Sequence, residues 1–194
     1  PGAEFCRVLI LPEKLFLFPV RLIEYLNFKL VTFIFWVPTA MANIAKLKAL
    51  NGIELKHLSH ILFAGEVMPA KVYMYWKKHL PKSLFSNLYG PTEITVDCTY
   101  IILTEDYKAS EPLPIGYPCR NSDILVLDDN DGVVLSPGID GELCVRGTSL
   151  ALGYYNDPEK TEKAFVQNPL NSHYPERIYR TGDIVYYNER GELM

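Results

Sequence analysis

An alternation of short apolar runs with helical patterns in the first half of the sequence most constrains the fold. Strand-like runs lie at residues 8–11, 31–36, 60–64 and 84–88. Between them, Pro19, Pro38 and Pro69 each stand where a helix would begin, because a proline in the first turn needs no N–H donor. Strands and helices that alternate in this way pair in parallel through right-handed crossovers. We therefore predict an α/β subdomain with a parallel sheet over residues 1–110.

Helical spacing also predicts which side chains face the core. Leu30 falls on the apolar face of the helix after Pro19, and Leu47 falls on the apolar face of the helix after Pro38. Because an amphipathic helix buries one apolar stripe, we expect both leucines to be buried.

The pattern changes near residues 111–114, which read Glu-Pro-Leu-Pro. Beyond this point the apolar runs are short, at 124–127, 142–146 and 178–187, and turns are frequent, with one short helix at 158–164. Short strands separated by turns are typical of antiparallel sheets. We predict a small antiparallel, β-barrel-like subdomain over residues 111–194.

Composition excludes several classes of function. The net charge of the 194 residues is -4, whereas nucleic-acid binders are usually basic. The longest apolar stretch, at 30–42, contains Pro38 and is too short to span a bilayer. Four cysteines, at 6, 98, 119 and 144, lack CxxC spacing, so we expect reduced, buried thiols. We therefore predict a cytoplasmic protein that has no membrane span and does not bind nucleic acid.

Residues 87–93 read Asn-Leu-Tyr-Gly-Pro-Thr-Glu and follow the predicted strand 84–88. Open α/β sheets bind ligands at the carboxyl ends of their strands. There Tyr89 offers a flat face for a purine, Asn87 offers a donor and an acceptor, and Thr92 can donate to a phosphate. Glu93 can hold a hard cation such as Mg²⁺. The alternative interpretation is a polar loop that only turns the chain.

Two further stretches are less specific when taken alone. Residues 179–183 read Tyr-Arg-Thr-Gly-Asp, and the turn presents Asp183, whose two oxygens suit the paired hydroxyls of a ribose. An ordinary aspartate in a turn is the alternative. Residues 141–147 (Gly-Glu-Leu-Cys-Val-Arg-Gly) and 153–158 (Gly-Tyr-Tyr-Asn-Asp-Pro) indicate structure more than chemistry.

In this order and spacing, the three stretches closely resemble the adenylate-forming enzyme superfamily. This group includes nonribosomal peptide synthetase adenylation domains, D-alanine–carrier-protein ligases, acyl-CoA synthetases and luciferases. Residues 64–66, Ala-Gly-Glu, also resemble the family's Gly-Gly-Glu stretch. The resemblance implies part of the large N-terminal domain of an ATP-dependent ligase, which joins a carboxylate to ATP, releases pyrophosphate and passes the acyl group to a thiol. The motif at 87–93 favours amino-acid activation, with the phosphopantetheine thiol of a carrier protein as acceptor.

The resemblance implies a nucleotide site. Tyr89 would stack on adenine, and Asn87, with the backbone around Gly65 and Glu66, would read the adenine edge. Asp183 would bind the ribose hydroxyls.

At the phosphates, the turn at Gly90 would present Thr92 to the α-phosphate, and Glu93 would hold Mg²⁺. Attack of a carboxylate on that phosphate brings negative charges together. Positioning and cation stabilisation must therefore supply most of the catalysis.

An acyl pocket follows from the same resemblance. Its positions fall at or next to Phe35, Leu62, Leu88, Val96 and Asp97. Large apolar groups would narrow the pocket and favour a small or apolar acyl group. Plain core packing is the alternative for Phe35 and Leu62. Asp97 is either a partner for a substrate ammonium or a solvated strand end.

The sequence also departs from the family. No stretch matches the glycine-, serine- and threonine-rich phosphate loop, no lysine matches the catalytic lysine motif, and Leu152 stands where the family usually has arginine. We therefore expect an excised core of a longer enzyme that does not catalyse adenylation by itself. The alternatives for the parent are an acyl- or aryl-CoA synthetase and, from another class, a non-catalytic remnant that acts as a binding module.

Overall fold

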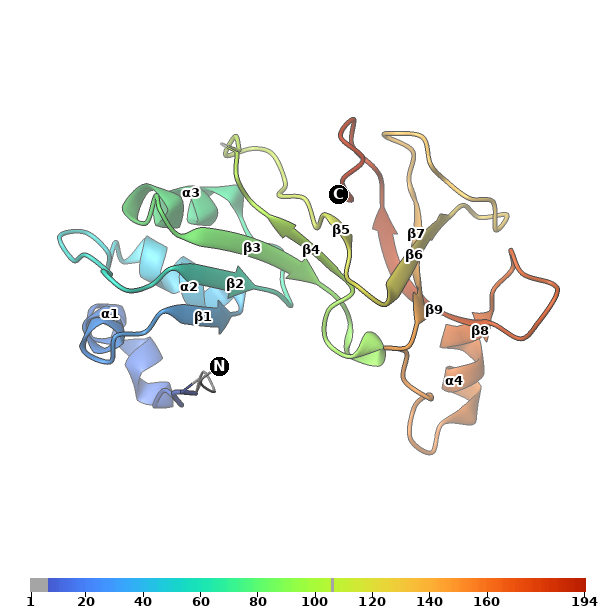
Figure 1. Ribbon diagram of the computed structural model, residues 1–194, viewed down its shortest axis with the longest axis horizontal. Helices are drawn as coiled ribbons and strands as arrows, with labels where there is room; N and C mark the ends of the chain where they lie inside the picture. The colour runs from blue at the N-terminus through green and yellow to red at the C-terminus, as the bar shows by residue number, and fades with distance from the viewer. Residues whose placement is uncertain (1–6, 106) are drawn as a thin grey trace, which may run out of the picture.

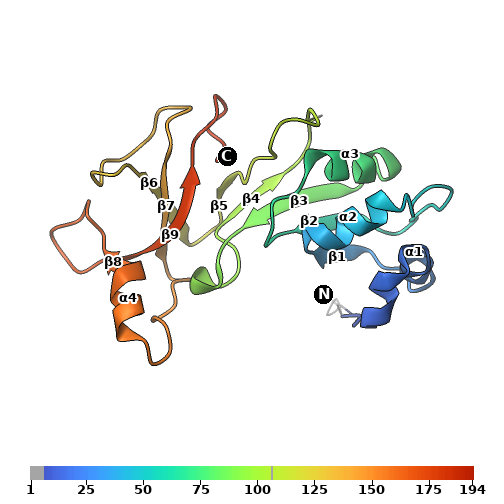
Figure 2. The same cartoon turned by 180° about the vertical axis from the view of Figure 1, so that it is seen from behind.

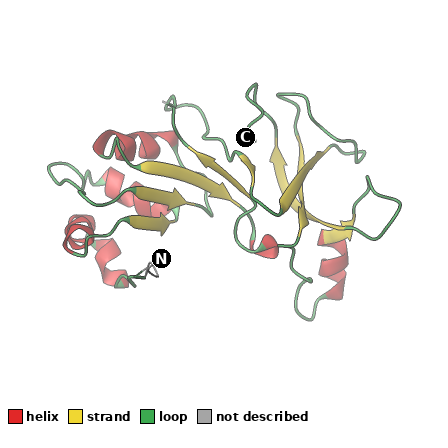
Figure 3. Ribbon diagram, in the orientation of Figure 1, coloured by secondary structure: helices red, strands yellow, loops and turns green. Residues whose placement is uncertain are grey.

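The protein is described by a computed structural model in which residues 7–105 and 107–194 are defined (Figure 1). Within these residues the chain forms two sheets that lie side by side (Figure 3). A five-stranded sheet has the order β1-β2-β3-β4-β5, and a four-stranded sheet has the order β6-β7-β9-β8. The first half is therefore the α/β part of the molecule, and the second half is built mainly of antiparallel strands.

The first sheet begins with three parallel strands, as predicted. They are β1 (Phe33–Trp36), β2 (His60–Phe63) and β3 (Leu84–Tyr89). The crossovers contain α2 (Pro38–Lys46) and α3 (Ala70–His79), and the chain enters through the 3-10 helix η1 (Glu13–Leu17) and α1 (Pro19–Phe28). Pro19 and Pro38 open their helices, whereas Pro69 is the N-cap of α3.

One face of this sheet is buried beneath the helices. Helix α2 lies behind the sheet in Figure 1 and in front of it in Figure 2. Side chains alternate along a strand, so Ile34 is buried whereas its neighbours Phe33 and Phe35 are exposed on the other face. The indole of Trp76, on α3, packs fully buried and donates a hydrogen bond to the carbonyl of Met41, on α2, at 3.1 Å.

The sheet continues with two antiparallel strands. β4 (Thr99–Ile102) pairs with β3, and β5 (Tyr117–Pro118) pairs with β4. β5 therefore belongs to the first sheet although it lies beyond residue 110, where the sequence pattern changes.

The second sheet consists of β6 (Ser122–Leu127), β7 (Gly141–Gly147), β8 (Phe165–Gln167) and β9 (Arg177–Val185), all paired antiparallel. It is an open sheet with β6 and β8 at its edges. Helix α4 (Pro158–Ala164) precedes β8, and the Asp157 side chain caps it by accepting from the backbone N–H of Lys160 at 3.0 Å.

Three local predictions are wrong. Residues 8–11 form no strand: they lie beside β1 without pairing to it, and Ile10 is 88% exposed. Leu30 and Leu47 are exposed. Helix α1 ends at Phe28 before Leu30 turns to a φ of 55°, and α2 ends at Lys46. Each helix therefore ends before its periodic pattern does, and these leucines leave the apolar face.

The thiols are free where the structure describes them. Cys98 and Cys144 are buried and Cys119 is half-buried, whereas Cys6 lies outside the described residues. Over the described ranges, no helix combines the length and the apolar character needed to traverse a bilayer.

Phe85 provides a test of the first core. Its ring is fully buried on β3 and packs edge-to-face against Tyr73, with centroids 5.4 Å apart. We expect Phe85→Ala to lower the free energy of unfolding by about 3–5 kcal/mol, because truncation removes apolar burial and leaves a cavity. Phe33→Ala, at a position that is 51% exposed, is the matched control and should cost about 0.5 kcal/mol or less. Urea denaturation followed by circular dichroism measures both values, and equal losses would contradict the assignment of the buried face.

Candidate functional site

A tight loop leaves β3 at the carboxyl end of the parallel strands and returns as β4. It contains the short 3-10 helix η2 (Thr92–Ile94), and the N–H of Cys98 closes it by donating to the carbonyl of Tyr89 at 2.8 Å. Gly90 is required by a close approach, because a Cβ there would lie 2.6 Å from the Cα of Asp97. Thr95 and Val96 both adopt left-handed backbone conformations, with φ of 64° and 80°. The sequence from Gly90 to Asp97 is thus folded back on itself.

A cavity of about 350 Å³ opens beside this loop. It is lined by six residues predicted from the sequence, namely Phe35, Gly65, Gly90, Thr92, Val96 and Asp97. Trp36, Val37 and Ala64 complete the lining. Two predicted pocket residues do not line it: Leu62 and Leu88 are half-buried on the face of the sheet that Phe35 occupies. The predicted acyl and phosphate positions therefore share one cavity.

Asp97 is the unusual residue of this cavity. Its Oδ1 is buried and has no hydrogen-bond partner among the described residues. Burial raises the pKa of the Asp97 carboxyl, because the charged form is poorly solvated there. A buried carboxyl oxygen without a partner is a ready acceptor for a ligand donor.

Tyr89 and Asp183 lie in contact although they come from different sheets. The Tyr89 hydroxyl donates a hydrogen bond to Oδ2 of Asp183. The predicted turn at residues 181–183 is wrong: these residues lie within β9, at a place where its register with β7 shifts. Gly182 takes a φ of 76° there, and the Thr181 hydroxyl donates to the carbonyl of Leu143 at 2.7 Å, so Asp183 lies in an irregular part of the strand. The residues predicted for adenine and for ribose are therefore neighbours.

Glu93 contacts the second half of the chain. Its Oε1 accepts a hydrogen bond from the Tyr154 hydroxyl at 2.7 Å. This hydrogen bond is the main cause that lowers the pKa of Glu93, so its carboxylate is ionised at neutral pH.

A magnesium ion fits this arrangement only in part. Across the described ranges, no group of three or more His, Cys, Asp or Glu side chains could hold a metal ion. Mg²⁺ commonly takes one or two carboxylates and completes its shell with water and substrate phosphates. A single ionised, half-exposed carboxylate such as Glu93 therefore suits an ion that arrives with a phosphate ligand.

The side chains of Glu66 and Asn87 make internal hydrogen bonds. Oε2 of Glu66 accepts from the N–H and the hydroxyl of Thr39, at 2.9 and 2.5 Å, which ties the loop after β2 to the first turn of α2. The buried amide of Asn87 donates to the carbonyl of Pro114 at 2.7 Å. In this arrangement both side chains stabilise the walls of the site.

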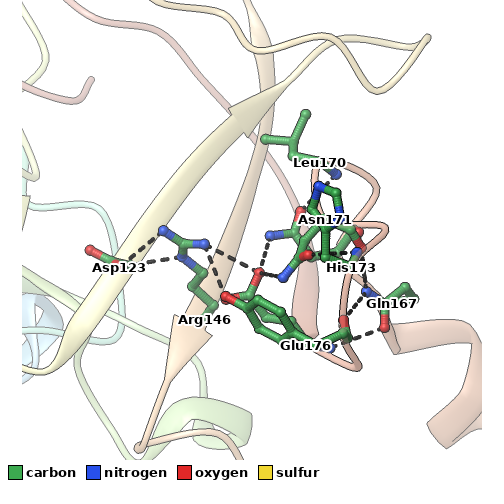
Figure 4. Close-up of polar contacts among 9 residues, drawn as sticks. Asp123, Arg146, Gln167, Leu170, Asn171, His173 and Glu176 are labelled. Atoms are coloured by element: carbon green, nitrogen blue, oxygen red, sulfur yellow. Dashed lines mark hydrogen bonds and ion pairs between the residues drawn. The ribbon is translucent and has the colours of Figure 1, made fainter.

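A larger hollow, of about 620 Å³, lies on the second sheet and contains none of the predicted site residues. Arg146 lines this hollow, and its guanidinium forms ion pairs with Asp123 and Glu176 at 3.2 and 3.1 Å (Figure 4). Glu176 also accepts from the side chains of Asn168 and Asn171. Because Glu176 pairs with Arg146 and accepts from Asn168 and Asn171, this network holds the loop between β8 and β9.

Sequence reasoning missed Tyr154, Val37 and Thr39 as parts of the site. The glycine-tyrosine stretch at 153–154 indicates structure more than chemistry, and 61 residues separate Tyr154 from Glu93. Only the pairing of the two halves brings Tyr154 to Glu93, so no local pattern could have identified it. Val37 and Thr39 lie directly after β1, and the rule that ligands bind at the carboxyl ends of parallel strands is the signal that could have found them.

Comparison with known proteins matches residues 5–155 to the family described as AMP-binding enzyme. The D-alanine--D-alanyl carrier protein ligase of Lacticaseibacillus casei (strain BL23) is 39% identical over 161 residues, which are 81% of this chain and 31% of that protein. The chain spans about a third or less of the curated relatives it matches.

Two solved structures share the fold. An NRPS protein containing adenylation and PCP domains superposes with a TM-score of 0.81 at 26% identity, over 91% of this chain and 30% of that one. The Vibrio cholerae adenylation domain AlmE, in complex with glycyl-adenosine-5'-phosphate, gives a TM-score of 0.79 at 27% identity, over 94% of this chain and 34% of that one.

Gly90 tests the geometry of the loop. We expect Gly90→Ala to destabilise the chain by about 1–3 kcal/mol, because the added methyl group would meet backbone atoms of residues 96–98 that cannot rotate away. Gly52→Ala is the control for replacing a loop glycine, since a Cβ there meets no atom within 4 Å, although its φ of 78° adds some strain. Chemical denaturation measures both losses, and a smaller loss for Gly90→Ala than for Gly52→Ala would contradict the close approach.

Proposed function

The chain belongs to the family of AMP-binding enzymes and forms part of an adenylation domain of the nonribosomal peptide synthetase type, and we propose that its parent protein activates an amino acid. The amino-acid carboxylate attacks the α-phosphorus of ATP, a new oxygen–phosphorus bond forms, and pyrophosphate leaves. The thiol of a carrier-protein phosphopantetheine then attacks the acyl carbon, and AMP leaves. The single observation that carries the proposal is the cavity that Thr92 and Asp97 line together, in a loop that also contains Glu93 and directly follows Tyr89, the hydrogen-bond partner of Asp183.

The nucleoside would lie at the junction of the two sheets. The ring of Tyr89 would stack on adenine, with the hydroxyl still bonded to Asp183 or released to solvent. The carboxylate of Asp183 would accept from the ribose hydroxyls. Asn87 and the backbone of Gly65 and Glu66 would border the adenine edge.

The phosphate end would lie at η2. The exposed Thr92 hydroxyl would donate to an α-phosphate oxygen, and Gly90 would allow the tight loop that presents Thr92, because the backbone of residues 96–98 fills the space of its Cβ. Mg²⁺, when bound at Glu93, would neutralise phosphate charge. The role of Thr92 and Glu93 is thus to hold the reacting groups where their mutual repulsion is offset.

The acyl group would occupy the remaining cavity. Phe35 and Val96 supply apolar walls, and the unpartnered oxygen of Asp97 would accept a hydrogen bond from a substrate ammonium. The names of the relatives agree with this class of substrate, since one is a D-alanine ligase and another binds a glycyl adenylate.

The full-length protein should catalyse ATP–pyrophosphate exchange that depends on an amino acid and on Mg²⁺. We expect Glu93→Gln to reduce this exchange by about 100-fold, because an amide cannot replace the charge that holds the cation near the phosphates. The 194-residue chain is the negative control, since it has no match to the family's phosphate loop or catalytic lysine. Absence of exchange with each of the twenty standard amino acids and with D-alanine would refute the proposed function.

Asp97→Asn tests the substrate contact. We expect kcat/KM for the preferred amino acid to fall about tenfold or more, with little change for the carboxylic acid that lacks its amino group, because the neutral amide pairs less strongly with an ammonium group. Exchange kinetics with the amino acid and with that carboxylic acid give this ratio. Identical kinetics for every amino acid would show that Asp97 does not contact the substrate.

A further inference from the structure

We infer that Tyr154 is a positioning residue that fixes the carboxylate of Glu93 for the phosphate end of the site. This inference rests on the proposed function. The Tyr154 hydroxyl donates to Oε1 of Glu93 at 2.7 Å. The terminal torsion of a free glutamate is broad, so a carboxylate held at one oxygen has a much narrower range of orientations. Second-layer partners of this kind orient metal-binding carboxylates in other proteins.

Tyr154 is itself held firmly. Its backbone N–H donates to the hydroxyl of Thr161 at 2.9 Å, and its ring packs edge-to-face on Phe165 with centroids 5.9 Å apart. The ammonium of Lys160 lies 4.0 Å from the centre of the same ring. Gly153 takes a φ of 145°, and Thr161 leaves no room for a side chain there. These contacts fix the ring of Tyr154 and therefore the position of its hydroxyl.

The segment between β7 and α4, which contains Tyr154, also holds the backbone of the loop at Glu93 and the side chain of Thr95. The N–H of Ala151 donates to the carbonyl of Glu93 at 2.8 Å, and the hydroxyl of Thr95 donates to the carbonyl of Ser149 at 2.8 Å. These two bonds do not involve Tyr154. Loss of the Tyr154 hydroxyl should therefore free the Glu93 carboxylate while the loop backbone stays in place.

The test uses the full-length enzyme with Tyr154→Phe, which keeps the ring and removes only the hydroxyl. Tyr155→Phe is the matched control, because Tyr155 is adjacent and fully exposed. Calorimetry with ATP in the presence of MgCl₂ or of EDTA measures how much the cation strengthens ATP binding. We expect Tyr154→Phe to weaken the Mg²⁺-dependent binding of ATP about tenfold or more, with little change in EDTA, and Tyr155→Phe to match the unaltered enzyme.

A double-variant cycle separates positioning from a merely structural role. If Tyr154 acts through Glu93, adding Tyr154→Phe to Glu93→Gln should cause no further loss of pyrophosphate exchange. Equal losses in both backgrounds, or unchanged Mg²⁺-dependent binding in Tyr154→Phe, would overturn the inference and leave the proposed function standing. Absence of exchange by the unaltered enzyme would instead overturn the proposed function and this inference with it.

Discussion

The hydrogen bond from the Tyr89 hydroxyl to Asp183 joins the two sheets at the point on which the candidate site depends. The two residues are 94 positions apart, and each lies in a strand of a different sheet. Tyr89 also packs against the apolar clusters of the second sheet, so the bond lies at the edge of a buried contact. Burial raises the pKa of Tyr89, which keeps the hydroxyl protonated and able to donate. Asp183 is exposed, so water competes for this bond, and the apolar packing of Tyr89 beside it supports the contact between the sheets.

Backbone strain in the loop after β3 makes the second sheet necessary. Thr95 and Val96 are consecutive residues in left-handed conformations, and such positions cost on the order of 1–3 kcal/mol each. They persist only where the surroundings hold them, and here Ser149 and Ala151 of the connector after β7 supply hydrogen bonds to the loop. The proposed phosphate end of the site is therefore ordered by contacts within the protein, and such preorganisation is the condition for effective electrostatic stabilisation.

The sequence predicted those parts of the fold and site that local patterns determine. The three parallel strands and the helices between them follow from apolar spacing, and the loop at 87–93 follows from its place after a buried strand. The strand at 8–11 was wrong because an apolar run needs a hydrogen-bonding partner, which β1 does not provide. The prediction that Leu30 is buried was wrong because the backbone leaves the helical conformation after Phe28, although the apolar spacing of the side chains continues to Leu30. The bond between Tyr154 and Glu93 lay beyond prediction because it exists only once the two halves have packed.

In the proposed site, the cavity would combine two sources of selectivity that differ in strength. Apolar walls such as Phe35 and Val96 discriminate weakly, since one methylene more or less changes binding by only about 10–200-fold. A buried polar group without a partner discriminates far more, because an analogue that lacks the matching donor leaves that group unpaired, at a cost of about 10⁴–10⁵-fold. Asp97 is such a group, with Oδ1 buried and unbonded among the described residues. The free-energy cost of burying this oxygen without a partner is recovered only by a ligand that brings a donor. In the proposed site, the choice between an amino acid and a carboxylic acid without an amino group would therefore depend more on Asp97 than on the size of the pocket.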